Sequence, residues 1–384
     1  MRKPPAPKVR IGYSPFSNTE NAYIDRNKEI LSRLGAVHEI PSLGQLFRHP
    51  HRYLASRLDV AIINWWENSI VSRKTGKLHL PGLCKFMVKA LALRLVARKV
   101  VFIRHNNYPH HTDHEKGERI ARLLDRLEKL FSISVTHSGH NENSERPYVP
   151  HPLYNKKPGS GRSAPLERQG DYFVAFGRIQ PYKKLEELID GFPPEKKLII
   201  AGPCKDDEYL RRITAASGQN IEIRAGYLAK DEAERLVANS HGMILSHAES
   251  DMIVSGSYFF ATSIGVPVHA IKTPFFEWAR RSFETRGLHI YENLAMLHDG
   301  IETAKQRNIK KEIIAYAGNS FGDRKVAEHW SKVFDRIGIA TRGHIQVVSS
   351  TPNPAEHKPK PRHLKASIQG IAGNTRQRSH HKTK

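Results

Sequence analysis

Short apolar runs alternate along this chain with segments of helical periodicity. In the first half, the apolar runs predict strands at residues 9–13, 37–40, 59–64, 99–104, 132–136 and 148–149. Apolar residues at helical spacing predict intervening helices at 22–34, 83–97 and 116–130. This alternation is typical of a parallel sheet that helices cover on both faces.

The alternation begins again after a polar stretch at 155–170, which is rich in Lys, Pro, Gly and Ser and is typical of a linker. Further strands are predicted at 172–177, 197–201, 221–224, 242–246 and 266–270, and further helices at 184–191, 208–216, 230–239, 257–264 and 326–337. We therefore predict two Rossmann-like α/β domains at 1–160 and 161–325, a C-terminal helix at 326–340 and a disordered basic tail at 341–384.

Length and composition agree with two packed domains in a reducing compartment. The chain has 384 residues, of which 39% are hydrophobic. Its two cysteines, Cys84 and Cys204, are too few for a disulfide framework. No signal-peptide pattern follows Met1, and no apolar run is long enough to span a bilayer. We expect a cytoplasmic protein that is soluble or peripheral on the inner face of the cell membrane.

The formal net charge of +23 indicates an anionic partner. The segment 351–384 contributes eight Lys and Arg residues against one acidic residue, Glu356. Zinc-finger spacing and aromatic RNA-binding strands are absent from the sequence, so we favour an anionic membrane surface over a specific nucleic acid. A merely solvated basic surface stays open. The helix 83–97 carries basic residues on several faces, and we expect it to pack on the first sheet rather than on a membrane.

Basic and small residues follow the strands of the second domain, where ligands of parallel sheets bind. Arg178 and Lys183 lie on one strand-to-helix loop after Gly177 and could hold a pyrophosphate. Gly202 permits a tight turn, and Tyr227 with Leu228 could hold a nucleobase. Small residues that open a helix could bind phosphate through backbone N–H groups: Ser255, Gly256 and Ser257. Solvated basic side chains and plain serine caps are the alternatives.

Together these motifs resemble the donor-binding domain of family-4-like glycosyltransferases of the GT-B fold. The resemblance covers residues 173–270 and comprises Phe176-Gly177-Arg178 with Lys183, the segment 198–202, Gly226-Tyr227-Leu228, and Glu249 before Gly265-Val266-Pro267-Val268. It implies two Rossmann-like domains with parallel sheets that face a central cleft, a GDP- or UDP-sugar donor, and a role for Glu249 at the transferred sugar.

The chain departs from this family where a second Glu often holds the ribose. Counting forward from Glu249 places Ser257 there, whereas counting back from Gly265 places Phe260 there. The Ser255-Gly256-Ser257 variant is similar to divergent bacterial exopolysaccharide transferases that act on lipid-linked sugars, β-mannosyltransferases among them. Both the contact to the ribose and the choice between retention and inversion stay open.

Polar and aromatic residues also follow the strands of the first domain. Trp65 and Trp66 could stack on an acceptor sugar, with a place in the core as the alternative, and Tyr13 and Asn18 border the acceptor in this fold class. The candidate bases for an inverting reaction are Glu67, His105 and Asp113. His137 and His151 follow later strands. A zinc site from His105, His110, His111 and His114 fits no standard spacing.

These features predict a transferase that moves a hexose from a nucleotide sugar to a lipid-linked saccharide in exopolysaccharide biosynthesis. Arg178, Lys183 and the helix start at Ser255 could neutralise the leaving diphosphate, so we expect neither a metal nor another cofactor. Two alternatives stay open: another nucleotide-sugar or sugar-phosphate enzyme on the same scaffold, and a basic nucleic-acid-binding protein.

Overall fold

The computed structural model describes residues 9–18, 22–72, 74–109, 112, 116–143, 145–156, 170–247, 253–304 and 309–341. All of these residues belong to one compact unit. Most of the predicted linker and nearly all of the predicted tail lie outside them, as do Asp113, Glu249 and three of the four histidines considered for zinc.

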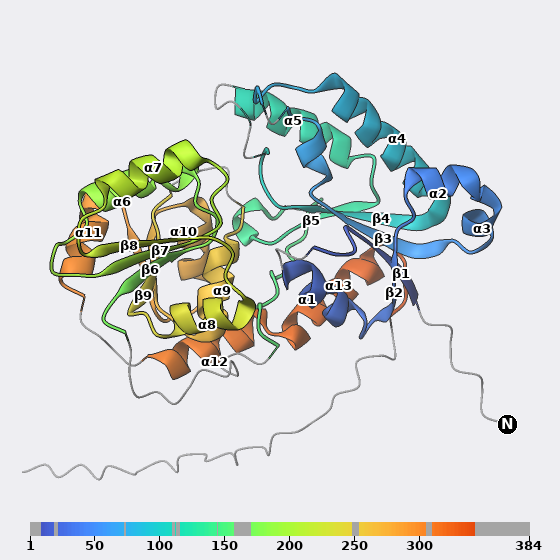
Figure 1. Cartoon of the computed structure of the whole chain (residues 1–384). Helices are drawn as coiled ribbons and strands as arrows, with labels where there is room; N and C mark the ends of the chain where they lie inside the picture. The colour runs from blue at the N-terminus through green and yellow to red at the C-terminus, as the bar shows by residue number, and fades with distance from the viewer. Residues whose placement is uncertain are drawn as a thin grey trace, which may run out of the picture. The chain divides into compact units, whose positions relative to one another are not determined.

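The first half of the chain forms a five-stranded parallel sheet (Figure 1). Its strand order is β2-β1-β3-β4-β5. The strands are β1 (Val9–Ser14), β2 (Gly35–Glu39), β3 (Leu58–Asn64), β4 (Ala97–Arg104) and β5 (Ile133–Thr136). The chain order reverses between β1 and β3, where Tyr13 pairs with Ile62, and such a reversal leaves a crevice at the carboxyl ends of parallel strands.

Two pairs of long helices cover the two faces of this sheet. One face packs on α4 (Leu80–Val96) and α5 (Gly117–Glu128), and the other on α1 (Ala22–Leu31) and α13 (Asp323–Arg336). Phe86, Ala90, Leu93 and Val96 of α4 are buried in the core, which confirms that this helix packs on the first sheet. Two short helices, α2 (Leu43–Arg48) and α3 (Pro50–Ala55), lie between β2 and β3 along the chain and contact α4.

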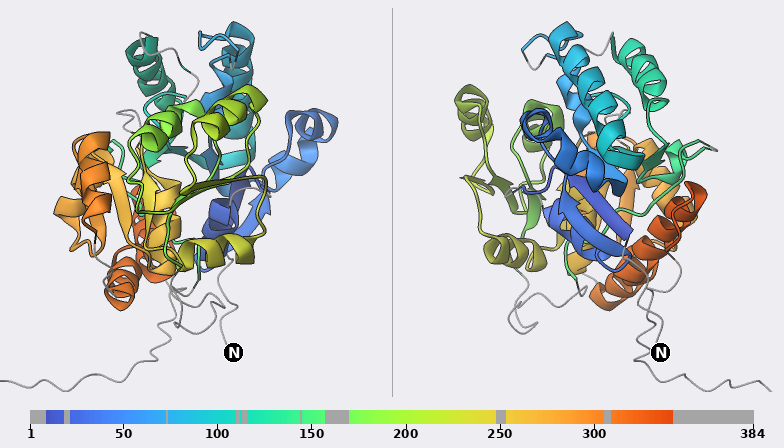
Figure 2. Two further views of the ribbon diagram at one scale, coloured as in Figure 1. Left: turned by 60° about the vertical axis from the view of Figure 1, so that its left-hand side comes forward. Right: turned by 90° about the vertical axis from the view of Figure 1, so that its right-hand side faces the viewer.

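The second half forms a six-stranded parallel sheet in the order β11-β10-β9-β6-β7-β8 (Figure 2). Its strands are β6 (Phe173–Phe176), β7 (Leu198–Gly202), β8 (Ile221–Ala225), β9 (Gly242–Leu245), β10 (Val268–Ile271) and β11 (Leu288–Tyr291). The chain order reverses between β6 and β9, so the crevice of this sheet opens beside the end of β6.

Helices cover both faces of the second sheet as well. One core contains residues of α6 (Leu185–Asp190), α7 (Asp207–Ala216) and α11 (Leu294–Glu302). The other contains residues of α8 (Lys230–Ala238), α9 (Gly256–Ile264), α10 (Pro274–Ser282) and α12 (Lys310–Phe321). Single 3-10 turns occur at η1 (Trp66–Ser69), η3 (Gly139–Asn141) and η4 (Pro181–Lys183).

The predicted fold class, two α/β domains with parallel sheets, is confirmed. Six elements were not predicted: α2, α3, α10, β11, α11 and α12. The first two are only six residues long and bury no residue completely, so their few apolar positions do not distinguish a helix from a loop. The predicted strand at 148–149 contributes only an isolated bridge between Thr136 and Tyr148. In the part of the chain that the structure describes, no helix is long and apolar enough to cross a lipid bilayer.

Candidate functional site

Two residues of the loop after β6 and one residue of α9 converge where β6 ends. Gly177 follows β6 with φ +117°, a conformation that favours glycine. A methyl group on its Cα would lie 2.9 Å from the Lys183 Nζ and 3.7 Å from the Ser257 Oγ. A methyl group on Gly202, at the end of β7, would overlap the Gly177 carbonyl oxygen. Glycine at both positions therefore keeps the backbone close and leaves space beside the Lys183 ammonium group.

Lys183 is held at this edge of the sheet by its own backbone. Its carbonyl oxygen accepts a hydrogen bond from the Ser246 hydroxyl at 2.6 Å, just beyond β9. Burial, together with the positive charge of Arg178, lowers the pKa of Lys183 to about 8. Arg178 is exposed on the same loop. The site thus holds one half-buried cation and one exposed cation, which suits an anion better than a neutral ligand.

The start of α9 adds backbone donors to this site. The Ser255 hydroxyl accepts a hydrogen bond from the Tyr258 N–H at 3.3 Å, so this side chain serves as the helix cap. Gly256 and Ser257 are the first residues of the helix, where N–H groups have no partner within the helix and the helix dipole is positive. Ser257 therefore combines a hydroxyl group near Lys183 with a helix start, an arrangement that suits phosphate.

The residues predicted to hold a nucleobase follow β8, two strands away from β6 in the sheet. The Gly226 N–H donates to the Gly202 carbonyl oxygen at 3.0 Å and so joins this turn to the glycine pair. Tyr227 is 71% exposed, and Leu228 packs against the second core. The exposed Tyr227 ring is free of the core and could cover a base.

A buried polar network occupies the equivalent crevice of the first sheet. The Asn64 amide, at the end of β3, donates through Nδ2 to the Ser14 carbonyl oxygen at 3.1 Å. Its Oδ1 lies 3.0 Å from His105 Nε2, so His105 donates there and its Nδ1 is left as an acceptor. Tyr13, at the end of β1, is buried beside this network.

Two further histidines complete the network. His137, directly after β5, donates through Nδ1 to the Val149 carbonyl oxygen at 2.8 Å, so its Nε2 accepts from the Tyr23 hydroxyl at 2.5 Å. His151 donates through Nδ1 to the Pro152 carbonyl oxygen at 2.8 Å. Burial lowers the pKa of His137 to about 4 and that of His105 and His151 well below the usual value. All three rings are therefore neutral at pH 7.

Aromatic contacts join this network to α9. The rings of Trp65 and His105 stack with centroids 4.5 Å apart, and those of His151 and Phe259 with centroids 4.4 Å apart. Phe260, at one of the two positions considered for the ribose, stacks on Phe176. The helix that presents Ser257 to Lys183 thus packs directly on the histidine network.

The structure separates several predicted site residues. Trp65 and Trp66 lie on opposite faces of the sheet. Trp66 packs on Phe86, and the Lys89 ammonium group lies 5.2 Å from the centroid of its ring. Glu67 is completely buried and Asn18 is exposed. Among the described residues, no group of three or more His, Cys, Asp or Glu could hold a metal ion.

Sequence reasoning missed Tyr23 and Asn64. Asn64 is the last residue of a mostly apolar strand, and a polar side chain at the carboxyl end of such a strand could have indicated a site residue. Tyr23 had none, because it reaches the network from α1 through tertiary packing.

No protein-family model and no curated protein sequence matches this chain significantly. Solved structures are similar to it. HepE from Anabaena, solved with UDP and glucose, is 15% identical over 85% of this chain and 100% of its own, with a TM-score of 0.58. AviGT4, a glycosyltransferase involved in avilamycin A biosynthesis, is 14% identical over 86% and 98%, with a TM-score of 0.54. A glycosyltransferase from Rickettsia africae is 11% identical over 86% and 98%, with a TM-score of 0.57.

Each of these structures is matched over nearly its whole length, so the structural similarity includes both sheets of this chain. The resemblance in sequence covered only the second. The predicted architecture is therefore confirmed, and the chain has the GT-B fold of glycosyltransferases.

Proposed function

We propose that this protein is a glycosyltransferase that moves a hexose from a nucleotide sugar to a saccharide acceptor. The observation that carries this proposal is the convergence of Gly177, Lys183 and Ser257 where the second sheet reverses its strand order. This position offers an ammonium group, a hydroxyl group and a helix start around one space, as a diphosphate requires. HepE, which shares the fold, has been solved with UDP and with UDP-glucose.

The reaction breaks the bond between the anomeric carbon and the diphosphate oxygen, which keeps the electron pair. A hydroxyl oxygen of the acceptor forms the new bond to that carbon, and its proton passes to a base. Lys183, Arg178 and the start of α9 would stabilise the charge that develops on the diphosphate. This arrangement supplies positive charge from the chain itself, so we propose a reaction that needs no metal ion or other cofactor.

His105 suits a hydrogen bond to the donor or acceptor sugar. Because its pKa is held well below the usual value by burial, it adds no positive charge that would compete for the diphosphate. Glu249 at the transferred sugar, and Glu67, His105 or Asp113 as the base, remain proposals from the sequence. Trp65, Tyr13 and Asn18 remain our candidates for the acceptor side.

The finer proposal concerns the acceptor and the location. The resemblance of Ser255-Gly256-Ser257 to exopolysaccharide transferases supports a lipid-linked saccharide acceptor, and the net charge of +23 supports binding to an anionic membrane surface. We therefore propose exopolysaccharide synthesis by a peripheral enzyme on the cytoplasmic face of the membrane.

Nucleotide binding tests the donor site. We expect calorimetry to show UDP or GDP binding by the full chain, and Lys183→Ala to weaken it about 10- to 100-fold, because a charge-assisted hydrogen bond contributes about 1.5–3 kcal/mol. Lys197→Ala is the control. This exposed lysine directly precedes β7, so it lies at the amino-terminal ends of the strands, away from the donor site at their carboxyl ends. Radiolabel transfer from a panel of nucleotide sugars into a lipid extract then identifies donor and acceptor.

Equal nucleotide affinity in wild type and Lys183→Ala would contradict the donor site. Salt-sensitive DNA binding without any nucleotide-sugar binding would instead support the nucleic-acid alternative.

A further inference from the structure

Exposed apolar side chains gather in one stretch of the first domain. Nine large apolar residues are exposed among the described residues, and seven of them lie between residues 47 and 95: Phe47, Leu54, Leu78, Leu80, Val88, Leu91 and Leu95. The other two, Tyr227 and Met296, are isolated in the second domain. A single exposed apolar residue needs no explanation, but such a concentration indicates an interaction surface.

The helix α4 carries four of these residues on one stripe. Leu80, Val88, Leu91 and Leu95 are 46–64% exposed, and their spacing places them on one side of the helix. The opposite side of α4 is buried against the first sheet. This helix is therefore apolar on two sides, and only one of them has a partner among the described residues.

The short helices α2 and α3 extend this apolar area. Both contact α4 and lie beside it in Figures 1 and 2. Leu46 and Tyr53 anchor them to the core under α4, while Phe47 and Leu54 point to the exterior with 75% and 49% exposure. We call the exposed residues of these three helices and of the loop before α4 the α2–α4 surface.

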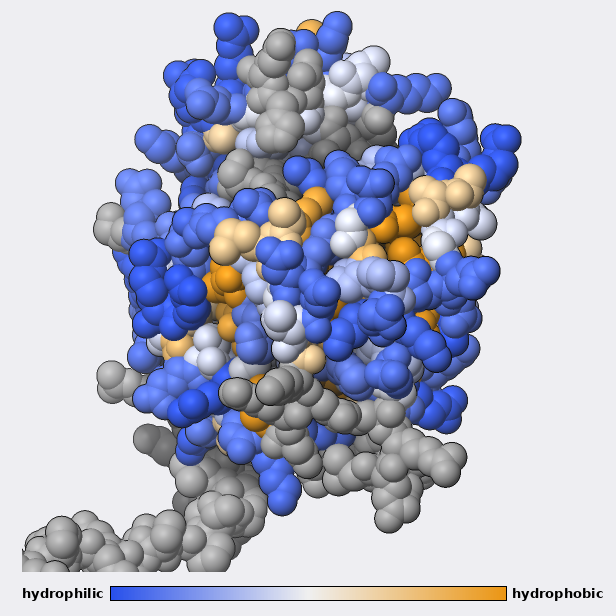
Figure 3. Space-filling model, turned by 90° about the vertical axis from the view of Figure 1, so that its left-hand side faces the viewer, coloured by the Kyte–Doolittle hydropathy of each residue, from blue (hydrophilic) through white to orange (hydrophobic). Residues whose placement is uncertain are grey.

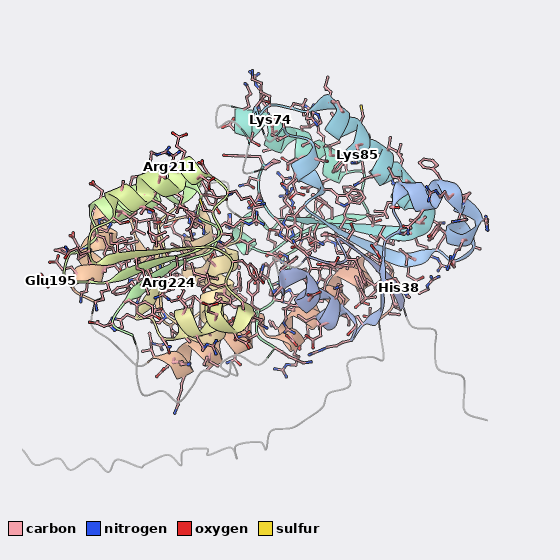
Figure 4. The ribbon with its side chains drawn as sticks, in the orientation of Figure 1. His38, Lys74, Lys85, Glu195, Arg211 and Arg224 are labelled. Atoms are coloured by element: carbon pink, nitrogen blue, oxygen red, sulfur yellow. The ribbon has the colours of Figure 1, made fainter. Side chains whose placement is uncertain are left out.

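Positive charge surrounds the apolar residues of the α2–α4 surface. The segment 41–98 contains ten Lys and Arg residues but only two acidic residues, Asp59 and Glu67. Asp59 pairs with Arg98, and Glu67 is buried, so neither offers an exposed carboxylate to compensate the cations. Lys74 and Lys85 extend to the exterior around α4 in Figure 4.

We propose that the α2–α4 surface docks this protein on an anionic lipid bilayer. The proposal rests on the peripheral enzyme proposed above and assigns the membrane contact to one surface. The leucines and Phe47 would enter the boundary between head groups and acyl chains, and the flanking lysines would contact anionic head groups.

Two observations support this assignment, one concerning the partner and the other the location of the surface. A second copy of this chain on the same surface would bring the uncompensated cations of both copies together, which opposes a symmetric dimer. The face of the second domain in Figure 3 is mostly hydrophilic, with apolar side chains visible only in separate areas.

Sedimentation of the full chain with lipid vesicles tests the proposal. We expect tighter binding to phosphatidylcholine vesicles with roughly one third phosphatidylglycerol than to pure phosphatidylcholine vesicles. The triple substitution Val88→Gln, Leu91→Gln, Leu95→Gln should lower the partition coefficient at least tenfold, and Lys74→Glu with Lys85→Glu should do the same at low salt. All five side chains lie outside the donor site, so UDP affinity of the same samples should be unchanged.

Matched controls stand in the second domain. Met296→Gln changes an exposed apolar residue of α11, and Lys205→Glu with Arg211→Glu reverses two exposed charges at and before α7. These variants should bind vesicles within twofold of wild type. The substitutions do not enter the core, so the melting temperature checks that each variant is folded.

Wild-type vesicle binding by both α2–α4 variants would overturn the proposal, and so would equal binding to neutral and anionic vesicles. Dimer dissociation or loss of DNA binding in these variants, with vesicle binding unchanged, would assign the surface to another partner and likewise overturn it. Normal UDP binding in any of these cases would leave the proposed donor site intact, which separates the two failures.

Discussion

Lys183 is the residue whose chemistry most directly connects the fold to the proposed reaction. An ordinary surface lysine has a pKa near 10.4, whereas enclosure and the nearby Arg178 lower that of Lys183 to about 8. The side chain thus remains mainly protonated at pH 7 and loses its charge in mildly alkaline solution.

A pH dependence of nucleotide affinity follows. The diphosphate favours the charged lysine, so the complex should keep the proton to a higher pH than the free protein does. Above pH 8 binding must therefore take up a proton, and we expect the Kd for UDP to rise about threefold between pH 7.5 and 8.5, below the pH at which the uracil ring ionises. Calorimetry across this range measures the effect, because the terminal phosphate of UDP is already ionised there.

Lys183→Arg provides the control for this titration, since guanidinium stays charged throughout the range. Its UDP affinity should be nearly constant between pH 7.5 and 8.5. A wild-type Kd that does not change with pH would show that Lys183 does not face the nucleotide.

At the scale of elements, α13 is the helix whose position is least apparent from chain order. It follows the second sheet but packs on the first, where Trp330 is completely buried with Val326 and Phe334. Asp323, its first residue, forms ion pairs with Arg26 and Arg33, the second at 2.7 Å. Both contacts hold the start of α13 against α1 and the residues that follow it.

We expect Trp330→Ala to lower the free energy of unfolding by about 3–5 kcal/mol, the usual cost of removing a buried tryptophan. Lys332→Ala, at an exposed position of the same helix, should cost less than about 0.5 kcal/mol. Urea unfolding followed by circular dichroism measures both values. Similar stability in the two variants would contradict the packing of α13 on the first sheet.

At the scale of the whole molecule, buried neutral histidines should make the protein sensitive to acid. The pKa of His137 is lowered to about 4 and that of His269 to about 3, in both cases mainly by burial. The unfolded chain binds protons at these side chains near pH 6.5, while the native protein does not. Their stabilising contribution is therefore complete above pH 6.5 and is lost as the pH falls toward 4.

For His137 alone this loss amounts to about 3 kcal/mol by pH 4. Urea unfolding at several pH values should show it, and His137→Gln should be less stable at pH 7 but should lose less stability on acidification. His38→Gln is the matched control, because His38 is exposed on β2 (Figure 4). An identical pH slope in wild type and His137→Gln would contradict burial of the neutral ring.

Most strands and the loop that we propose binds the diphosphate could be predicted because they depend on local order along the chain. Apolar runs such as 198–202 identify buried strands, and Gly177, Arg178 and Lys183 are close in sequence. The short helices α2 and α3 could not be predicted, since neither buries a residue and each is held by contacts with α4.

The sequence by itself determined the two parallel α/β domains, the basic charge and the loop that carries Gly177, Arg178 and Lys183, because these follow from local periodicity and composition. Tertiary structure alone decided which residues meet. Only in the folded structure does Tyr23 contact His137, and only there do Trp65 and Trp66 lie on opposite faces of the sheet. The packing of α13 on the first sheet and the exposure of the second apolar side of α4 are likewise tertiary features. The physical reason is that burial and hydrogen bonding depend on which surfaces pack together, and a pattern along one segment does not contain its partner.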